Sequence, residues 1–221
     1  GTPPLNIGNE KECLYANNVY FDVKDGKAAI IKRKGYTLIN STAAGAKIVH
    51  ISQFSIDTIE YVMCIDDNGV YYSVDLDLGT ITQTKAGTVA GAKWTSATLN
   101  GKHYVANSTE GLWYTTDNAT WAQVGGTSPL AGIITLFKNR LIAALNNTVY
   151  WTELGDGLTW NDGESPAVNF KNDLDTGDSD TITGLGIIGE QLLVFKQHMF
   201  YRVFATDDSS GHLAFRFIPV Y

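Results

Sequence analysis

The chain has few cysteines, a deficit of positive charge and no long apolar run, and each shortage argues against a class of protein. Cys13 and Cys64 are the only cysteines among 221 residues, and no CxxC or His/Cys ligand spacing occurs, so a zinc site is not expected. The 16 Lys and Arg are outnumbered by 23 Asp and Glu, and the net charge of -7 argues against nucleic-acid binding. No apolar stretch reaches the ~18–20 residues that a membrane-spanning helix needs.

The two cysteines and the first residue bear on the origin of the chain. Cys64 lies within the apolar run 61–65, which favours two buried free thiols over a disulfide with Cys13. No signal peptide is visible, and the chain starts with Gly1 rather than Met. We therefore expect a processed or excised piece.

Helical periodicity is also missing, and a different repeat is present. No ten-residue stretch has the helical period, so the chain is expected to be nearly all β. An apolar residue followed by two aromatics recurs at residues 19, 70, 112, 149 and 199, so successive copies start 51, 42, 37 and 50 residues apart. This interval is about one four-stranded propeller blade. The copies are Val19-Tyr20-Phe21, Val70-Tyr71-Tyr72, Leu112-Trp113-Tyr114, Val149-Tyr150-Trp151 and Met199-Phe200-Tyr201.

The same order of strands and turns surrounds the later copies, with the aromatic pair on the third strand. A turn such as Asn68-Gly69 precedes that strand, because both residues tolerate positive φ. Large side chains there fit between successive blades, since a blade buries its faces against its neighbours. We predict an all-β propeller of about five four-stranded repeats in one domain, 1–221. The repeat units are roughly 1–40, 45–86, 90–126, 130–172 and 180–221.

The first repeat is incomplete. Only eighteen residues precede Val19, and Pro3-Pro4 lies among them, so they cannot supply two full strands. Either another segment closes this blade, or the chain is a stretch of a longer propeller. The sequence leaves both readings open.

Two segments resemble degenerate Asp boxes, the S-x-D-x-G-x-T-W hairpin of sialidase-like propellers. They are 115–121, which lacks the glycine and one residue, and 156–160, in which the glycine is shifted. In that family the box is a turn between the outer two strands, away from the catalytic centre. The resemblance therefore supports a blade and not an activity.

The expected innermost strands argue against an enzyme. They contain no Asp, Glu or Arg, whereas glycoside cleavage generally needs two carboxyl groups. We expect no catalytic residue and no cofactor, with a glycoside hydrolase as a less favoured reading. These strands are 47–51, 92–98, 133–137 and 182–188.

The sequence contains two further patterns that resemble ligand sites. Closely spaced carboxylates can hold calcium, but the EF-hand pattern is absent, so a solvated acidic loop is favoured over a metal site. A G-x-G-x-x-G run binds phosphate only when a helix begins after it, and none is expected here. The carboxylates are Asp173, Asp175, Asp178 and Asp180, and the glycines are Gly184, Gly186 and Gly189.

Histidines and tryptophans give the remaining candidates. No histidine stands in a nucleophile motif, so all four are interpreted as turn or strand surface: His50, His103, His198 and His212. Tryptophans could serve as stacking platforms of a lectin-like propeller if exposed, or as packing residues if buried. They are Trp94, Trp113, Trp121, Trp151 and Trp160.

Two stretches resemble propeller-like virion proteins of tailed bacteriophages. The run from Asn18 to Tyr36 is similar to their "N-x-x-F…G…x-R-x-G" opening, although Lys34 stands where the family often has proline. Residues 149–160, 180–185 and 191–196 resemble their "YWS…W…D-x-I-T-G-L…LLVFK" core. The two stretches cover roughly half of the chain.

The resemblance implies a structural subunit of a tail, nozzle or head-to-tail region that works by assembly. We expect a non-enzymatic component of a virion, or an extracellular protein, with other virion or assembly subunits as partners in an oligomer. No membrane span and no specific nucleic acid are expected. A carbohydrate-binding propeller with a glycan partner is the alternative.

Overall fold

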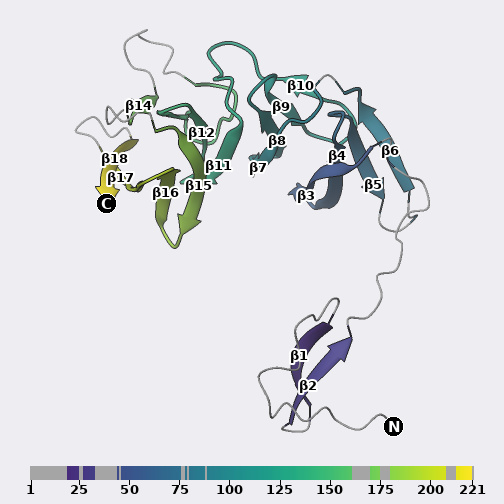
Figure 1. Cartoon of the computed structure of the whole chain (residues 1–221). Coiled ribbons are helices and arrows are strands. Elements are labelled where there is room, and N and C mark those ends of the chain that lie inside the picture. Colours follow the sequence, from purple (N-terminus) through teal and green to yellow (C-terminus); the bar gives the residue numbers. More distant parts are fainter. Residues whose placement is uncertain are drawn as a thin grey trace. The chain divides into compact units, whose positions relative to one another are not determined.

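The computed structural model is built from strands and turns (Figure 1). It describes residues 19–24, 27–32, 44, 46–75, 78, 80–87, 89–160, 170–174, 180–207 and 213–220. None of these residues lies in a helix, so no membrane-spanning helix is found among them. The chain divides into two compact units, 1–39 and 40–221. That 1–221 form a single domain stays a prediction.

The first unit contains an antiparallel pair of strands, β1 (Val19–Lys24) and β2 (Lys27–Lys32). Six residue pairs hold the register, from Val19 opposite Lys32 to Lys24 opposite Lys27. The first aromatic pair, Tyr20-Phe21, lies on β1. The structure thus describes two strands in the first repeat, compared with four in each later repeat.

The second unit contains four sheets, each made of four consecutive antiparallel strands. The first sheet has β3 (Ile48–Ile56), β4 (Ile59–Asp66), β5 (Tyr71–Asp75) and β6 (Thr80–Lys85). The second sheet has β7 (Thr95–Leu99), β8 (Lys102–Asn107), β9 (Gly111–Thr115) and β10 (Ala122–Gln123). The third has β11 (Ile133–Phe137), β12 (Arg140–Leu145), β13 (Thr148–Trp151) and β14 (Lys171–Asp173). The fourth has β15 (Ile182–Ile188), β16 (Gln191–Lys196), β17 (Phe200–Asp207) and β18 (Leu213–Val220).

Each sheet lies within one of the predicted repeat units, except that β14 extends one residue beyond 130–172, and the predicted fold class is confirmed. The first strand of each sheet contacts the first strand of the next: β3 with β7, β7 with β11, and β11 with β15. Three apolar cores fill the spaces between the four sheets. The second and third sheets are thus covered on both faces, as a propeller blade requires.

The aromatic pairs lie on the third strands β5, β9, β13 and β17, as predicted. Because successive side chains on a strand point to opposite faces, the two rings of one pair reach two different neighbours. On β9, Trp113 lies under the ammonium of Lys85 from the preceding sheet, 4.2 Å from the ring centroid. Its neighbour Tyr114 packs on the core shared with the following sheet. The pairs therefore join successive sheets.

The predicted turn before β5 has a fixed geometry. The buried Asp66 carboxylate accepts hydrogen bonds from the backbone N–H groups of Asn68 and Val70 and from the Tyr72 hydroxyl, at 2.9, 2.9 and 3.0 Å. Gly69 has φ of 75°, and a Cβ at this position would lie 2.6 Å from the Val89 carbonyl oxygen. Only glycine meets both conditions.

Candidate functional site

The second unit contains a cluster of hydroxyl and imidazole groups where the first two sheets meet. His50 and Ser52 come from β3, Ser96 and Thr98 from β7, and His103 from β8. Alternation along each strand places the two residues of β3 on one face and the two residues of β7 on one face. We define these five residues as the hydroxyl–imidazole cluster.

Four short contacts connect the cluster into one chain. His50 Nε2 lies 3.2 Å from Ser96 Oγ, and Ser96 Oγ donates to Ser52 Oγ at 3.1 Å. Ser52 Oγ is 3.1 Å from His103 Nε2, and His103 Nδ1 is 2.8 Å from Thr98 Oγ1. Both ring nitrogens of His103 thus have hydroxyl partners, one from each sheet.

The environment of His103 keeps its ring neutral. The residue is 1% exposed, and its ring stacks on Phe54 with centroids 3.7 Å apart and planes 1° apart. Burial, and to a lesser extent the nearby His50, lowers the pKa of His103 to about 3. Burial also lowers the pKa of His50. At neutral pH the imidazole of His103 therefore donates one hydrogen bond and accepts another.

The prediction that all histidines lie in turns or on strand surfaces was wrong for His103, because β8 is buried on both faces. His198 is exposed, with Nδ1 3.4 Å from an oxygen of Asp180. His212 lies outside the described residues. The two-residue turn Asn100-Gly101 places Thr98 opposite His103, so this one contact of the cluster could be predicted from the sequence. Nothing in the local sequence places Ser52 beside them.

The cluster brings a serine and a histidine together, but the third group of a nucleophilic triad differs. In such triads a carboxylate orients the imidazole and stabilises its charged form. Here the hydroxyl of Thr98 takes that position. A histidine with a pKa of about 3 is a weak base at neutral pH. The geometry suits a neutral hydrogen-bonded clasp between two sheets better than proton transfer.

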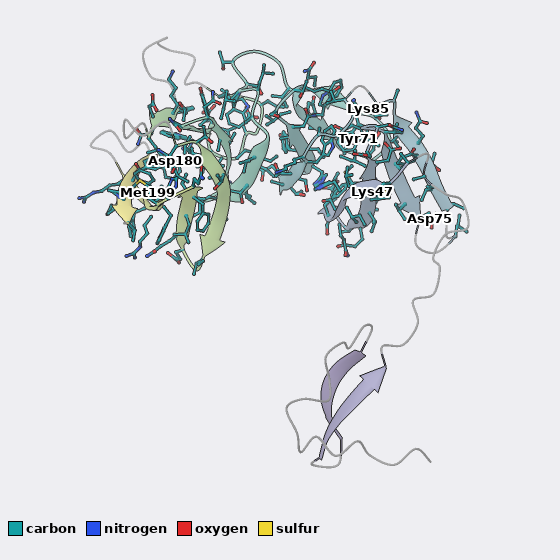
Figure 2. All side chains as sticks on the ribbon, viewed as in Figure 1. Lys47, Tyr71, Asp75, Lys85, Asp180 and Met199 are labelled. Atoms are coloured by element: carbon teal, nitrogen blue, oxygen red, sulfur yellow. The ribbon has the colours of Figure 1, made fainter. Side chains whose placement is uncertain are left out.

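A second polar contact joins the fourth strand of the first sheet to the turn before β9 in the second sheet. Lys85 Nζ of β6 lies 3.5 Å from Glu110 Oε2, and both side chains are about 10% exposed. The ammonium also lies 4.7 Å from the ring centroid of Tyr71, beside Trp113, and Figure 2 labels Lys85 and Tyr71 in this region. Burial, with a smaller effect from Glu110, strongly raises the pKa of Tyr71. One buried cation thus joins two aromatic rings and a carboxylate across the junction.

The Asp-box-like segment 115–121 forms the turn between β9 and β10, the outer two strands of the second sheet. Asp117 accepts hydrogen bonds from the N–H groups of Ala119 and Thr120 and from the hydroxyls of Thr115 and Thr120. The hydrogen bonds from Thr120, chiefly, hold the pKa of Asp117 far below its usual range. Asn118, with φ of 57°, supplies the positive φ that glycine would otherwise supply here.

This turn also contacts the preceding sheet. The Asn118 amide donates to the Val62 carbonyl oxygen and to Ser73 Oγ, at 3.1 and 3.0 Å. Trp121 Nε1 donates to Thr84 Oγ1 at 3.1 Å. The Trp121 ring packs against Tyr71. The turn therefore connects the first two sheets through the side chains of Asn118 and Trp121.

The second Asp-box-like segment, 156–160, repeats the arrangement one sheet later. Asp156 accepts hydrogen bonds from the Leu158 N–H and the Thr159 hydroxyl, and the buried Trp160 joins the core between the second and third sheets. A Cβ on Gly157 would lie 2.4 Å from the ring of Tyr104. The glycine is required because the turn touches the preceding sheet.

The candidate metal loop is described only in part. Asp173 ends β14, and the buried Asp180 accepts from the N–H groups of Gln197 and His198 at 3.1 and 3.0 Å. Asp175 and Asp178 lie outside the described residues. Among the residues that are described, no group of three or more His, Cys, Asp or Glu could hold a metal ion. Asp180 stabilises the turn before β17.

The first two G-x-G-x-x-G glycines lie on a strand, and the third lies in the turn that follows it. Gly184 and Gly186 belong to β15, and Gly189 has φ of 58° in the following turn. A Cβ on Gly186 would approach the Phe195 ring to 3.2 Å. These glycines make room for that ring, and β16 follows them rather than a helix.

All five tryptophans are buried or half-buried, which fits packing better than ligand stacking. Trp94, Trp151 and Trp160 are buried, and Trp113 and Trp121 are half-buried. Their rings contact other side chains from neighbouring sheets, as Trp151 does with Phe215 at 5.1 Å. The lectin-like alternative stays a prediction without a structural feature in its favour. Cys64 is a buried free thiol, as predicted, and Cys13 lies outside the described residues.

The first and last sheets each have one exposed apolar face. The outer face of the first sheet, opposite its core, carries Ile51, which is 68% exposed, together with Val49, Val62, Val74 and Ile81. The outer face of the last sheet carries Ile188, which is 69% exposed, together with Phe195, Phe200 and Ile218. Contiguous exposed apolar residues of this kind mark interaction surfaces.

No protein-family model matches the chain, and no curated protein matches it. Three solved structures are similar, each at 12% identity. Dihydro-heme d1 dehydrogenase NirN in complex with DHE has a TM-score of 0.53, covering 98% of this chain and 47% of that chain. The N-terminal domain of Nup159 has a TM-score of 0.50, covering 91% and 58%. The designed Ika4 protein has a TM-score of 0.51, covering 84% and 99%.

These likenesses bear on the fold alone, because the identities are low. NirN and Nup159 are β-propellers, and the chain has the β-propeller fold. It spans about half of the NirN and Nup159 chains that it matches.

Proposed function

We propose that the chain is a non-catalytic structural module that acts through contacts with other protein subunits, as a component of a tailed-phage tail or nozzle. The observation that carries this proposal is the pair of exposed apolar faces on the first and last sheets, represented by Ile51 and Ile188. A propeller blade normally buries such faces against another blade. Faces of this kind suit contact with further protein.

The polar groups of the second unit support a structural role. The hydroxyl–imidazole cluster, the Lys85–Glu110 pair and the turn at Asp117 are all engaged in contacts within or between sheets. The first strands β3, β7, β11 and β15 contain no Asp or Glu, whereas glycoside hydrolysis generally uses two carboxyl groups. These features support assembly over catalysis.

The phage assignment rests on the sequence resemblance. Its described segments fall on strands and turns: 149–151 on β13, 182–185 on β15 and 191–196 on β16. These positions build the third and fourth sheets. The resemblance therefore concerns a shared structural framework, which is what a virion subunit would retain.

The proposal is tested on particles purified from the source that encodes the chain. We expect peptides of the chain at a fixed ratio to other structural subunits, and density for stacked four-stranded sheets in electron micrographs of the particles. A glycan array with the isolated chain is the companion measurement. Absence from the particles together with selective glycan binding would favour the lectin-like alternative instead.

A further inference from the structure

The two exposed faces differ in charge, which bears on what can cover them. On the first sheet, Glu60 lies on the same face as Ile51. Glu60 pairs with Ser55 of β3, and Ser55 is four positions from Ile51, so both side chains point to the same side of the strand. On the last sheet, Arg202 and Arg216 are exposed on the same face as Ile218.

Contact between unlike faces is favoured over contact between like faces. Two copies of the last-sheet face would bring Arg202 and Arg216 of one copy against those of another. The first-sheet face offers a carboxylate, Glu60, and an apolar centre instead. Like charges placed opposite each other destabilise an interface, and complementary charges fix its register.

The internal sheet junctions show the same combination of parts. Between the first and second sheets, an apolar core including Tyr71 lies beside the Lys85–Glu110 ion pair. On the last-sheet face, the Arg202 guanidinium lies 5.2 Å from the ring centroid of Phe204 on the third strand and donates to Gln191 at 3.0 Å. An aromatic third-strand residue beside a cation is therefore present on the uncovered face as well.

A second copy of this chain offers both of the unlike faces at once. The chain covers 58% of the Nup159 chain, 47% of the NirN chain and 99% of the Ika4 chain. A second copy of this chain would add four further four-stranded sheets and one more of each exposed face.

We infer that the outer face of the last sheet docks on the outer face of the first sheet of a second copy. The reciprocal junction closes a two-copy propeller, since a head-to-tail interface yields a ring when the rotation closes. Ile188, Phe195 and Ile218 of one copy then face Ile51 and Val49 of the other. This inference rests on the proposed function, because it names the partner of the same faces.

The test measures the mass of the full chain in solution, at about 1–100 µM, by light scattering coupled to size-exclusion chromatography. We expect two copies for the unmodified chain and one copy for Ile51→Arg or Ile188→Arg. Mixing the two variants restores two copies, because the last sheet of the first variant and the first sheet of the second are both intact. Leu154→Arg, at a site 60% exposed outside both faces, retains two copies.

The outcomes that would overturn the inference are distinct. A single copy for the unmodified chain would show that the faces do not join two copies. Two copies for Ile188→Arg alone would mean that first-sheet faces pair with each other. Circular dichroism establishes that each variant is folded, and Glu60→Arg, a second exposed variant, is expected to weaken association at least tenfold.

The proposed function fails separately from this inference. A single-copy chain that is nevertheless present in particles would overturn the two-copy propeller and leave the assembly role intact. A chain that forms two copies but is absent from the particles would overturn the assembly role and leave the two-copy propeller intact.

Discussion

One buried imidazole makes the junction of the first two sheets sensitive to acid. The unfolded chain takes up a proton on His103 near pH 6.5, whereas the folded protein holds that pKa at about 3. The stability of the folded state is therefore fully present above about pH 6.5 and decreases as the pH falls towards 3, because only the unfolded state binds the proton in this window. We expect a loss of up to about 1.4 kcal/mol per pH unit from this group.

The measurement is urea unfolding at several pH values between 4 and 7. His103→Gln is expected to lower stability at pH 7 and to remove about one proton from the pH dependence. His198→Gln changes an exposed ring and serves as the control. An unchanged pH slope in His103→Gln would show that this residue does not titrate as argued.

At the same junction, a single ammonium holds two rings and a carboxylate. Lys85→Met retains most of the side-chain volume but leaves Glu110 buried without its cation, so we expect a loss of about 2–3 kcal/mol in the free energy of unfolding. Adding Glu110→Gln to this variant should recover part of the loss.

The Lys138–Glu190 pair is the matched control for Lys85. Its side chains are 41% and 89% exposed, so Lys138→Met should change the free energy of unfolding by less than about 0.5 kcal/mol. Equal effects of Lys85→Met and Lys138→Met would contradict the importance of burial at the first pair.

Among the elements, the turn between β9 and β10 connects sheets as well as strands. Asp117→Ala removes the acceptor of four hydrogen bonds and loosens Asn118 and Trp121 on the preceding sheet. We expect a loss of about 1–2 kcal/mol, measured by thermal or urea unfolding. Asp156→Ala in the related turn removes two hydrogen bonds and should cost less. The reverse order would mean that hydrogen bonding is not what these turns contribute.

The sequence was most informative about elements and least informative about contacts between them. The turn predicted at Asn68-Gly69 occurs before β5, and Gly69 adopts the positive φ that such a turn needs. The first strand of the first sheet was predicted to end at residue 51 but extends to Ile56. In its segment Ser52–Ile56 the core-facing position Ser52 is polar, so the alternation rests on Phe54 and Ile56 alone and is too short to identify the strand.

The hydroxyl–imidazole cluster illustrates the same limit. Pairing of Thr98 with His103 follows from a two-residue turn and is readable from the chain. The approach of Ser52, 51 residues away, depends on how two sheets pack. The burial of His103 likewise arises because β8 is covered on both faces, and a strand of this kind lacks the alternation of a half-exposed strand.

At the scale of the whole molecule, the four sheets of the second unit pack one after another, and this order predicts how stability is distributed among them. In such arrays each unit is stabilised mainly by its neighbours, so units with two neighbours should open less often than units with one. The amides of β8 and β12, in the second and third sheets, are expected to exchange hydrogen more slowly than those of β4 and β16 in dilute solution. Mass spectrometry of exchanged peptides measures the four strands in one experiment.

The same experiment separates packing within one copy from association of two. If the outer faces join copies, raising the protein concentration through the association range should slow exchange in β4 and β16 but leave β8 and β12 unchanged, because binding stabilises only what it covers. Ile51→Arg should abolish this concentration dependence, whereas Leu154→Arg should not. Equal protection of all four strands at every concentration would show that the first and last sheets are already covered within a single chain.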